Sequence, residues 1–209
     1  MGFIINPFVF AAASPIPTSG LQIWLKGDTG VIESTGAVDT WQDQSGNGNH
    51  FTQTANSTFR PTYSASTCLI FDGSNDFLSA TTTCTIGHYF IVMTPSGTQG
   101  YGSLIACQTR HCLIRDDTTA NLYTSVVKIF GGLANVRKNE ATSTNLGTTM
   151  AQWNDKGTAE TGLRMLLGKD VNGGAAAAGR IYEVIVYSAA LSDTDRNTVE
   201  DYLQAKYGL

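Results

Sequence analysis

The sequence predicts an all-β protein built as a two-sheet sandwich, with an extended N-terminal arm and one C-terminal helix. Charged residues make up only 14% of the chain, against about 25% in a typical globular domain, and there are 22 glycines. Threonine, which is frequent, favours pleated sheets, while glycine and asparagine favour turns. From residue 20 onward, short apolar runs alternate with polar turns. This pattern excludes a helical bundle and a coiled coil.

The first part of the chain differs from the rest, so we divide the sequence into an apolar arm at residues 1–19 and one domain at residues 20–209. Large apolar side chains left in water promote aggregation, so the arm is expected to pack either on its own sheet or on another subunit. No Lys or Arg precedes the apolar run and Asn6-Pro7 interrupts it, which argues against a secretory signal. The candidate assembly residues of the arm are Phe3, Ile4, Ile5, Pro7, Phe8 and Phe10.

The strands are predicted, in chain order, from apolar runs bounded by polar turn residues. We expect them at 21–25, 69–71, 77–78, 89–93, 104–106, 112–114, 125–130, 163–167 and 181–187. The run at 181–187 is the most typical strand, because it has β-branched residues on both faces. About a dozen short strands at this spacing indicate a sandwich.

One helix is predicted at the end of the domain. Ser192 is suited to cap it, Asp193 and Asp195 favour its first turn, and Gly208 ends it. Apolar residues recur at spacings of three and four, so one face of the helix is expected to cover the sandwich as a structural lid.

Several segments, taken in order along the domain, resemble concanavalin A-like and laminin-G-like domains. They are LQIWL at 21–25, WQDQSGNGN at 41–49, RP at 60–61, LIFDGSND at 69–76, GRIYEVIVYSAALSDTDR at 179–196, VEDYL at 199–203 and KYG at 206–208. The resemblance implies two antiparallel sheets in a jelly roll, with a concave face that binds carbohydrate in many relatives.

A second resemblance covers the arm. The segment IINPFVF at residues 4–10 is similar to the opening of tailed-bacteriophage structural proteins that carry such domains. It implies a virion protein made in the host cytoplasm. That compartment is reducing, which suits the expectation that Cys68, Cys84, Cys107 and Cys112 are free thiols.

The carboxylate motif of glucanases with this fold is missing. Those enzymes place Glu and Asp two residues apart on one strand, and no Glu of this chain has an Asp two residues on. A Gly-x-Ser-x-Gly elbow is also absent. We therefore expect no catalytic residues, no enzyme activity and no cofactor.

The polar loop after Trp41 has oxygen groups in a tight turn, which Ca²⁺ could use. The calcium candidates are Asp43, Asn47 and Asn49. A structural turn is the simpler interpretation, because strong calcium binding needs several carboxylates and this loop does not have them. Trp41 and Trp153 lie beside polar residues and are the candidates for stacking on a sugar, although core or rim packing is the interpretation we favour for both.

The net charge of −4 and the isoelectric point near 5.2 argue against nucleic acid or an anionic membrane as a partner. Two functions remain. The first is a virion structural protein, either a capsid decoration (cement) protein or a tail-associated module. Its partners would be the major capsid or tail protein and copies of itself, with a trimer as our expectation. The alternative is a carbohydrate-binding module, secreted or on a phage tip, that recognises cell-surface glycan.

Overall fold

The computed structural model describes residues 14–64, 67–95, 103–107, 110–115, 122–123, 136–138, 141–142, 150–154, 160–169, 176 and 178–209. In the strands between residues 110 and 160 only the backbone is described. The strands are β1 (Leu21–Lys26), β2 (Val31–Ser34), β3 (Ala37–Trp41), β4 (Phe51–Thr52), β5 (Thr62–Ser64), β6 (Cys68–Asp72), β7 (Leu78–Ala80), β8 (Cys84–Ile86), β9 (His88–Pro95), β10 (Ser103–Cys107), β11 (Arg110–Arg115), β12 (Leu122–Tyr123), β13 (Val136–Lys138), β14 (Ala141–Thr142), β15 (Met150–Asn154), β16 (Glu160–Leu163), β17 (Met165–Leu167) and β18 (Ala178–Tyr187). A 3₁₀ turn, η1, spans Ser57–Phe59, and the helix α1 spans Asp193–Tyr207.

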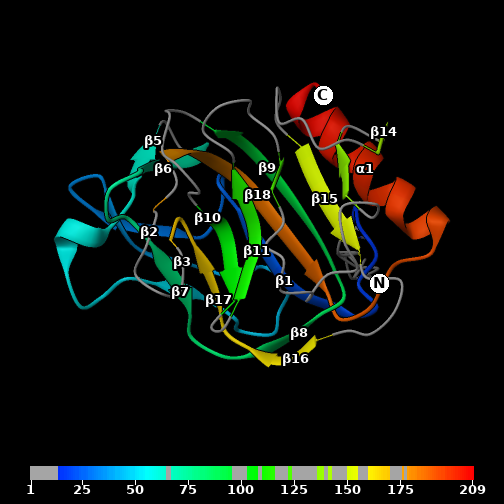
Figure 1. Ribbon diagram of the computed structural model, residues 1–209, viewed down its shortest axis with the longest axis horizontal. Coiled ribbons are helices and arrows are strands. Elements are labelled where there is room, and N and C mark those ends of the chain that lie inside the picture. Colours follow the sequence, from blue (N-terminus) through cyan, green and yellow to red (C-terminus); the bar gives the residue numbers. More distant parts are fainter. Residues whose placement is uncertain are drawn as a thin grey trace, which may run out of the picture.

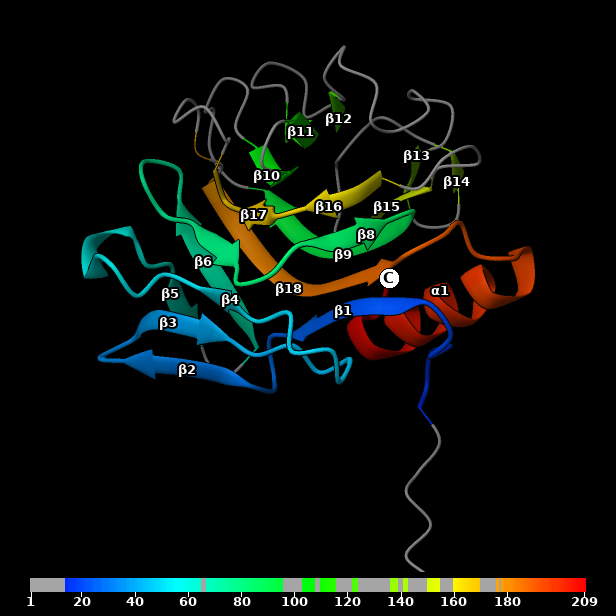
Figure 2. The ribbon, with the colours of Figure 1, turned by 90° about the horizontal axis from the view of Figure 1, so that it is seen from below.

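Sixteen of the described strands form one curled antiparallel sheet, and β8 pairs with β16 in a second, two-stranded sheet (Figures 1 and 2). The order in the large sheet is β12-β11-β10-β17-β7-β4-β3-β5-β6-β18-β9-β15-β13-β14, with β1 added on β18 and β2 on β3. The predicted all-β antiparallel class is therefore confirmed, and the curled sheet fits a β-sandwich. Its finer jelly-roll type stays a prediction.

The strands β1, β9 and β18 are buried on both faces because their alternate residues enter two different apolar clusters. Tyr89, Ile91 and Met93 of β9 point into the main core, which the curled sheet encloses. Phe90 and Val92, the residues between them, point to the other face and contact the cluster under α1. This double burial explains the β-branched residues on both faces of 181–187.

Helix α1 begins and ends as the sequence predicted. The Ser192 hydroxyl accepts a hydrogen bond from the Asp195 backbone N–H, and Gly208 adopts a left-handed conformation at the C-terminal end with φ of 67°. Val199 and Leu203 are fully buried against β1, β9 and β18. The helix therefore covers the outer face of the central strands (Figure 2). In the described part of the chain, no helix is long and apolar enough to span a bilayer.

One predicted strand differs from the structure. The run at 163–167 is divided at Arg164, because β16 pairs with β8 in the small sheet whereas β17 pairs with β7 and β10 in the large one. The chain thus passes from one sheet to the other at Arg164. The predicted strand at 125–130 lies outside the described residues.

Candidate functional site

A groove with a volume of about 310 Å³ lies on the large sheet where β4 and β7 run side by side. We call it the β4–β7 groove. Its lining residues are Thr52, Gln53, Thr54, Ala55, Phe77, Ser79, Ala80, Thr81 and Arg164. Figure 1 shows β7 beside β17, the strand that follows Arg164.

Strand register brings the hydroxyl groups of the groove together. Thr52 of β4 pairs with Ser79 of β7, and Ser79 pairs in turn with Leu166 of β17. Phe51, the neighbour of Thr52, is fully buried in the core. Because side chains alternate along a strand, Thr52 and Ser79 lie on the opposite face of the sheet, where they line the groove.

Gln53 supplies a side-chain amide that the surrounding backbone holds in place. Its backbone N–H donates to the Asp39 carbonyl at 2.9 Å, and its own carbonyl accepts from Arg60 Nε at 2.7 Å. The side-chain Oε1 accepts from the Asn56 N–H at 3.4 Å. Within the described residues, the side-chain nitrogen donates to no partner. A nearly buried amide with a spare donor at the wall of a groove is suited to bind a ligand oxygen.

Phe77 forms the apolar part of the groove. Its half-buried ring lies 6.2 Å from the ring of Phe59, centroid to centroid, and Lys169 Nζ lies 5.0 Å from its centroid. Gly168 makes the turn from β17 to Lys169 with φ of 83°, and a Cβ there would lie 2.2 Å from Cδ1 of Phe71. Only glycine fits this position, so the approach of Lys169 to Phe77 depends on it.

The loop before Phe77 is held by two carboxylates with opposite pKa shifts. Burial raises the pKa of Asp76 to about 6, and the charge of Asp72 adds to this; Asp76 Oδ2 accepts from the Asp72 N–H at 2.9 Å. Desolvation acts to raise the pKa of Asp72, but hydrogen bonds from the backbone of Ser74, Asn75 and Asp76 lower it overall. The loop is thus a structural turn that fixes the start of β7. No cluster of three or more metal-binding side chains occurs within the described ranges.

Trp41 does not offer a face to a sugar. It is fully buried at the end of β3, and its indole N–H donates to the Lys26 carbonyl at 2.9 Å. The structure thus gives Trp41 the core-packing role and not the stacking one, because the side chain points into the core although polar loop residues follow it. Trp153 lies in β15, whose side chains are outside the described part, and its role stays a prediction.

In the loop after Trp41, both carboxylate oxygens of Asp43 accept hydrogen bonds from the protein itself. Asp43 Oδ1 accepts from the N–H groups of Trp24 (2.8 Å) and Ser45 (2.9 Å), while Oδ2 accepts from the Ser45 hydroxyl (2.7 Å) and the Asn49 N–H (3.0 Å). The side-chain amides of Asn47 and Asn49 donate to carbonyls of β1, at Leu21 and Gln22. This geometry supports the structural-turn interpretation of Asp43, Asn47 and Asn49.

The arm residues Phe3, Ile4, Ile5, Pro7, Phe8 and Phe10 lie outside the described residues, so the assembly and virion predictions stay predictions. The described part of the predicted arm contacts the domain. Ile16 is buried in the cluster under α1, and the Pro17 carbonyl accepts from the Tyr187 hydroxyl at 2.9 Å.

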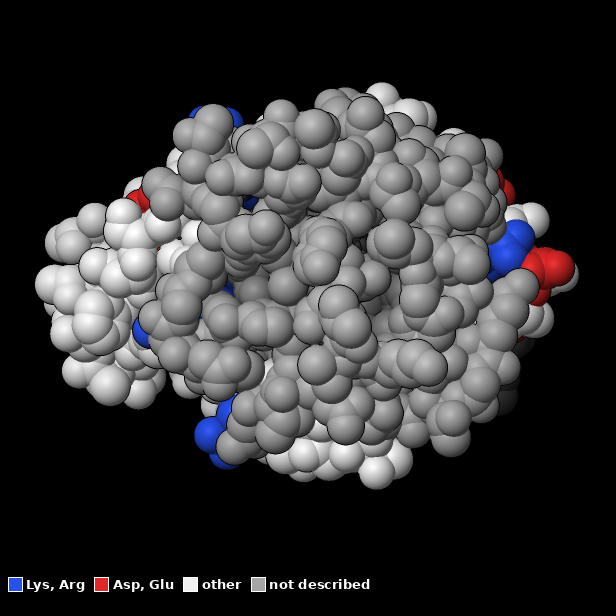
Figure 3. Space-filling model, viewed as in Figure 1, with Lys and Arg blue, Asp and Glu red and all other residues white. Residues whose placement is uncertain are grey.

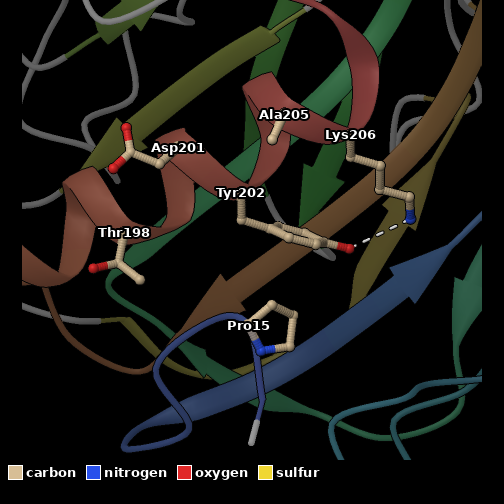
Figure 4. Close-up of a pocket in the computed structure, with 6 residues that line it drawn as sticks. All are labelled: Pro15, Thr198, Asp201, Tyr202, Ala205 and Lys206. Carbon is tan, nitrogen blue, oxygen red and sulfur yellow. Dashed lines mark hydrogen bonds between the residues drawn. The ribbon is translucent and has the colours of Figure 1, made fainter. Parts of the chain in front are cut away.

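A larger hollow of about 560 Å³ lies beside α1, lined by Pro15, Thr198, Asp201, Tyr202, Ala205 and Lys206 (Figure 4). Its most prominent polar groups are already engaged. Lys206 Nζ contacts Glu183 Oε2 at 2.8 Å and Asp28 Oδ2 at 2.9 Å, and the Tyr202 hydroxyl lies 3.4 Å from Nζ. We interpret this hollow as the seam between helix and N-terminal segment.

Sequence reasoning missed the groove residues Gln53, Phe77 and Arg164, and Lys169 beside them. They come from separate segments that only the register of β4, β7 and β17 brings together, and no motif marks them. On the face of the molecule in Figure 3, the described Lys and Arg side chains lie at separate points on the rim.

No family model and no curated protein sequence matches the chain. Solved structures do match. A Trypanosoma rangeli sialidase in complex with 2,3-difluorosialic acid is 12% identical, with a TM-score of 0.56 over 99% of this chain and 36% of that chain. The same sialidase with sialic acid matches at 12% identity and a TM-score of 0.54, over 92% of this chain and 34% of that chain. The chain thus spans about a third of the sialidase, and at this identity the likeness concerns the fold alone.

A GH54 α-L-arabinofuranosidase matches at 14% identity over 81% of this chain and 51% of that chain, with a TM-score of 0.44, too low to indicate a shared fold. The sialidase match corrects one prediction. We expected no enzyme activity because a glucanase motif is missing, but the chain shares its fold with part of an enzyme of another class. A motif missing from one enzyme family therefore does not exclude an enzyme, and that exclusion is withdrawn.

Proposed function

We propose that this chain is a glycan-binding module with a concanavalin A-like jelly-roll sandwich, and that the saccharide lies in the β4–β7 groove. The observation that carries the proposal is the composition of the groove. It combines a half-buried aromatic ring, a nearly buried amide with a spare donor, four hydroxyl-bearing side chains and one guanidinium.

These groups match the chemistry of a saccharide. Sugar rings have apolar C–H faces that pack on aromatic carbon, and hydroxyls that both donate and accept hydrogen bonds. Phe77 offers the first kind of contact. Gln53, Thr52, Ser79 and Arg164 offer the second, and because all four are in or next to strands, the rigid sheet fixes their spacing.

The structural neighbours support a link to glycans. The sialidase structure contains sialic acid, and this chain matches about a third of its length, which is the size of one module within a longer protein. A module that binds glycan is also compatible with the virion prediction, because a particle protein can recognise cell-surface sugars.

The test is a glycan array with the full chain and two matched variants. Thr81→Trp places an indole in the groove from its exposed rim, and we expect it to abolish glycan binding. Thr83→Trp is the control, because Thr83 is also exposed and does not line the groove. Thermal unfolding of both variants confirms that the fold is kept. Binding that survives in Thr81→Trp would place the glycan elsewhere, and no binding by the unmodified chain to any glycan would refute the function.

A further inference from the structure

The charge around the β4–β7 groove is opposite to that of the whole protein. The chain has a net charge of −4, yet the charged residue in the lining of the groove is Arg164. Lys169 is not in the lining, but its Nζ lies over the Phe77 ring, 5.0 Å from the centroid. One cation therefore lines the groove and a second lies over its aromatic side chain.

Neither cation is neutralised by a neighbour. Arg164 is exposed, and within the described residues neither Arg164 nor Lys169 forms an ion pair. Arg60, which lies behind the groove, is different because it pairs with Asp39 at 3.3 Å and donates to the carbonyls of Gln53 and Thr54. Arg60 thus holds the wall of the groove, and the positive charge open to a ligand comes from the other two.

The two acidic side chains of the loop before Phe77 bind backbone groups of that loop. Asp76 precedes Phe77, but it is buried and accepts a hydrogen bond from the Asp72 backbone within its own loop. Asp72 is likewise occupied by the N–H groups of Ser74 and Asn75. No acidic residue lines the described groove, so the charge that an anion meets in its lining is positive.

We infer that the saccharide bound in the β4–β7 groove is acidic, with a carboxylate or a sulfate that Arg164 and Lys169 bind while its ring packs on Phe77. This inference rests on the proposed function and makes it more specific. The guanidinium can bind either anion through two parallel N–H donors, and the ammonium contributes a point charge beside the ring.

The experiment uses the full chain on an array of glycans printed in charged and neutral pairs. The pairs are sialylated and unsialylated glycans, uronic acid oligomers with and without methyl esterification, and sulfated and desulfated oligomers. We expect the charged member to be bound at least about tenfold more tightly, and this preference to weaken as NaCl is raised. The esterified and desulfated pairs distinguish carboxylate from sulfate.

Three variants complete the test by titration with the preferred glycan. Arg164→Ala and Lys169→Ala should each weaken binding by about tenfold or more, whereas Arg180→Ala, which removes an exposed arginine outside the groove, should leave it unchanged. Arg164→Lys should retain part of the affinity. Equal binding of the charged and neutral members of a pair, or full affinity in Arg164→Ala, would overturn the inference. If Thr81→Trp still abolishes binding when this happens, the glycan-binding function of the groove stands. No binding to any glycan would refute both.

Discussion

Trp24 of β1 donates its indole N–H to the buried carboxylate of Glu183 on β18, with 2.6 Å between Nε1 and Oε1. The second oxygen of this carboxylate accepts from Lys206 at 2.8 Å and from the Tyr207 hydroxyl at 2.7 Å, both on α1. One fully buried side chain therefore joins two central strands to the helix. Glu183 is charged and buried, and its three donors satisfy it.

Replacing Glu183 by Gln should destabilise the protein by about 3 kcal/mol, because the amide keeps the shape but turns one of its two acceptor atoms into a donor that faces Lys206 and Tyr207. Urea unfolding at pH 7 measures the change. Asp201→Asn, which removes a carboxylate from the exposed side of the same helix, should change the free energy of unfolding by less than about 0.5 kcal/mol. Equal effects of the two substitutions would contradict a special role for Glu183.

The same cluster makes the protein sensitive to alkaline pH. Burial and the charge of Glu183 raise the pKa values of the Tyr202 and Tyr207 hydroxyls. Desolvation acts to lower the pKa of Lys206, but Glu183 and Asp28 raise it overall. All three groups bind protons more tightly in the folded state, so their contribution is complete below pH of about 10 and is lost as pH rises further.

We therefore expect an unfolding midpoint that is constant from pH 8 to 9.5 and falls steeply above pH 10, with tyrosinate absorbance that rises only as the protein unfolds. Tyr207→Phe should lower stability at pH 8, because Glu183 loses a donor, and should make the decline above pH 10 shallower. A decline of the same steepness in this variant would exclude Tyr207 as a source.

The two carboxylates of the loop before β7 should respond oppositely to neutralisation. Asp76 has a raised pKa of about 6, so its ionisation costs stability as pH rises from about 4 to 6. Asp76→Asn should therefore stabilise the protein at pH 7.5 by roughly 1 to 3 kcal/mol, since the amide oxygen can still accept from the Asp72 N–H. The pKa of Asp72 is lowered, so Asp72→Asn should destabilise at pH 7.5, with a difference that disappears as pH falls below about 4. Guanidinium unfolding from pH 3 to 8 distinguishes the signs; two shifts in the same direction would contradict them.

Asp43 should contribute strongly to the free energy of unfolding, and calcium should not change the stability of the protein. Asp43→Ala leaves the buried N–H groups of Trp24 and Asn49 without their acceptor, which we expect to cost about 2 to 4 kcal/mol. Ser45→Ala removes a part-buried hydroxyl that contacts the same carboxylate, the Gln22 carbonyl and Asn47, but it leaves the Asp43 carboxylate on the N–H groups of Trp24 and Asn49, and should cost about 1 kcal/mol. Addition of millimolar CaCl₂ should leave the thermal midpoint of the unmodified protein unchanged. A calcium-dependent rise that Asp43→Ala removes would instead identify a metal site.

The regular parts of the fold were predictable because local pattern decides them. The runs at 21–25, 69–71, 89–93 and 181–187 correspond to β1, β6, β9 and β18, whose apolar residues enter the two clusters. Helix α1 was equally predictable, because the residues that cap it, Ser192 and Gly208, directly flank it in the sequence. The short strands β2 to β5 were missed, since none of them has the apolar run of a core strand, although β2 with β3 and β5 with β6 pair as neighbours along the chain.

The candidate site was hidden for a related reason. Trp41 was chosen for a polar neighbourhood along the chain, but the direction of its side chain follows from the alternation of β3, which the neighbouring loop does not reveal. Arg164 belonged to an apparent continuous strand, and only the change of pairing partner shows that it stands at a junction. The pairing register between strands decides both the direction of the Trp41 side chain and the position of Arg164, and a single sequence does not reveal that register.

The pairing of β1 with β18 sets the order of events during synthesis. Leu21 lies opposite Tyr187 and Lys26 opposite Glu183, so the β1–β18 ladder joins residues more than 150 positions apart. While the ribosome is still making the middle of the chain, β1 has no partner and its apolar side chains stay exposed. The sheet closes only after β18 has left the exit tunnel, and α1 then covers it. Because these contacts are so far apart in sequence, we expect slow folding, and we expect C-terminally truncated fragments that lack β18 to aggregate.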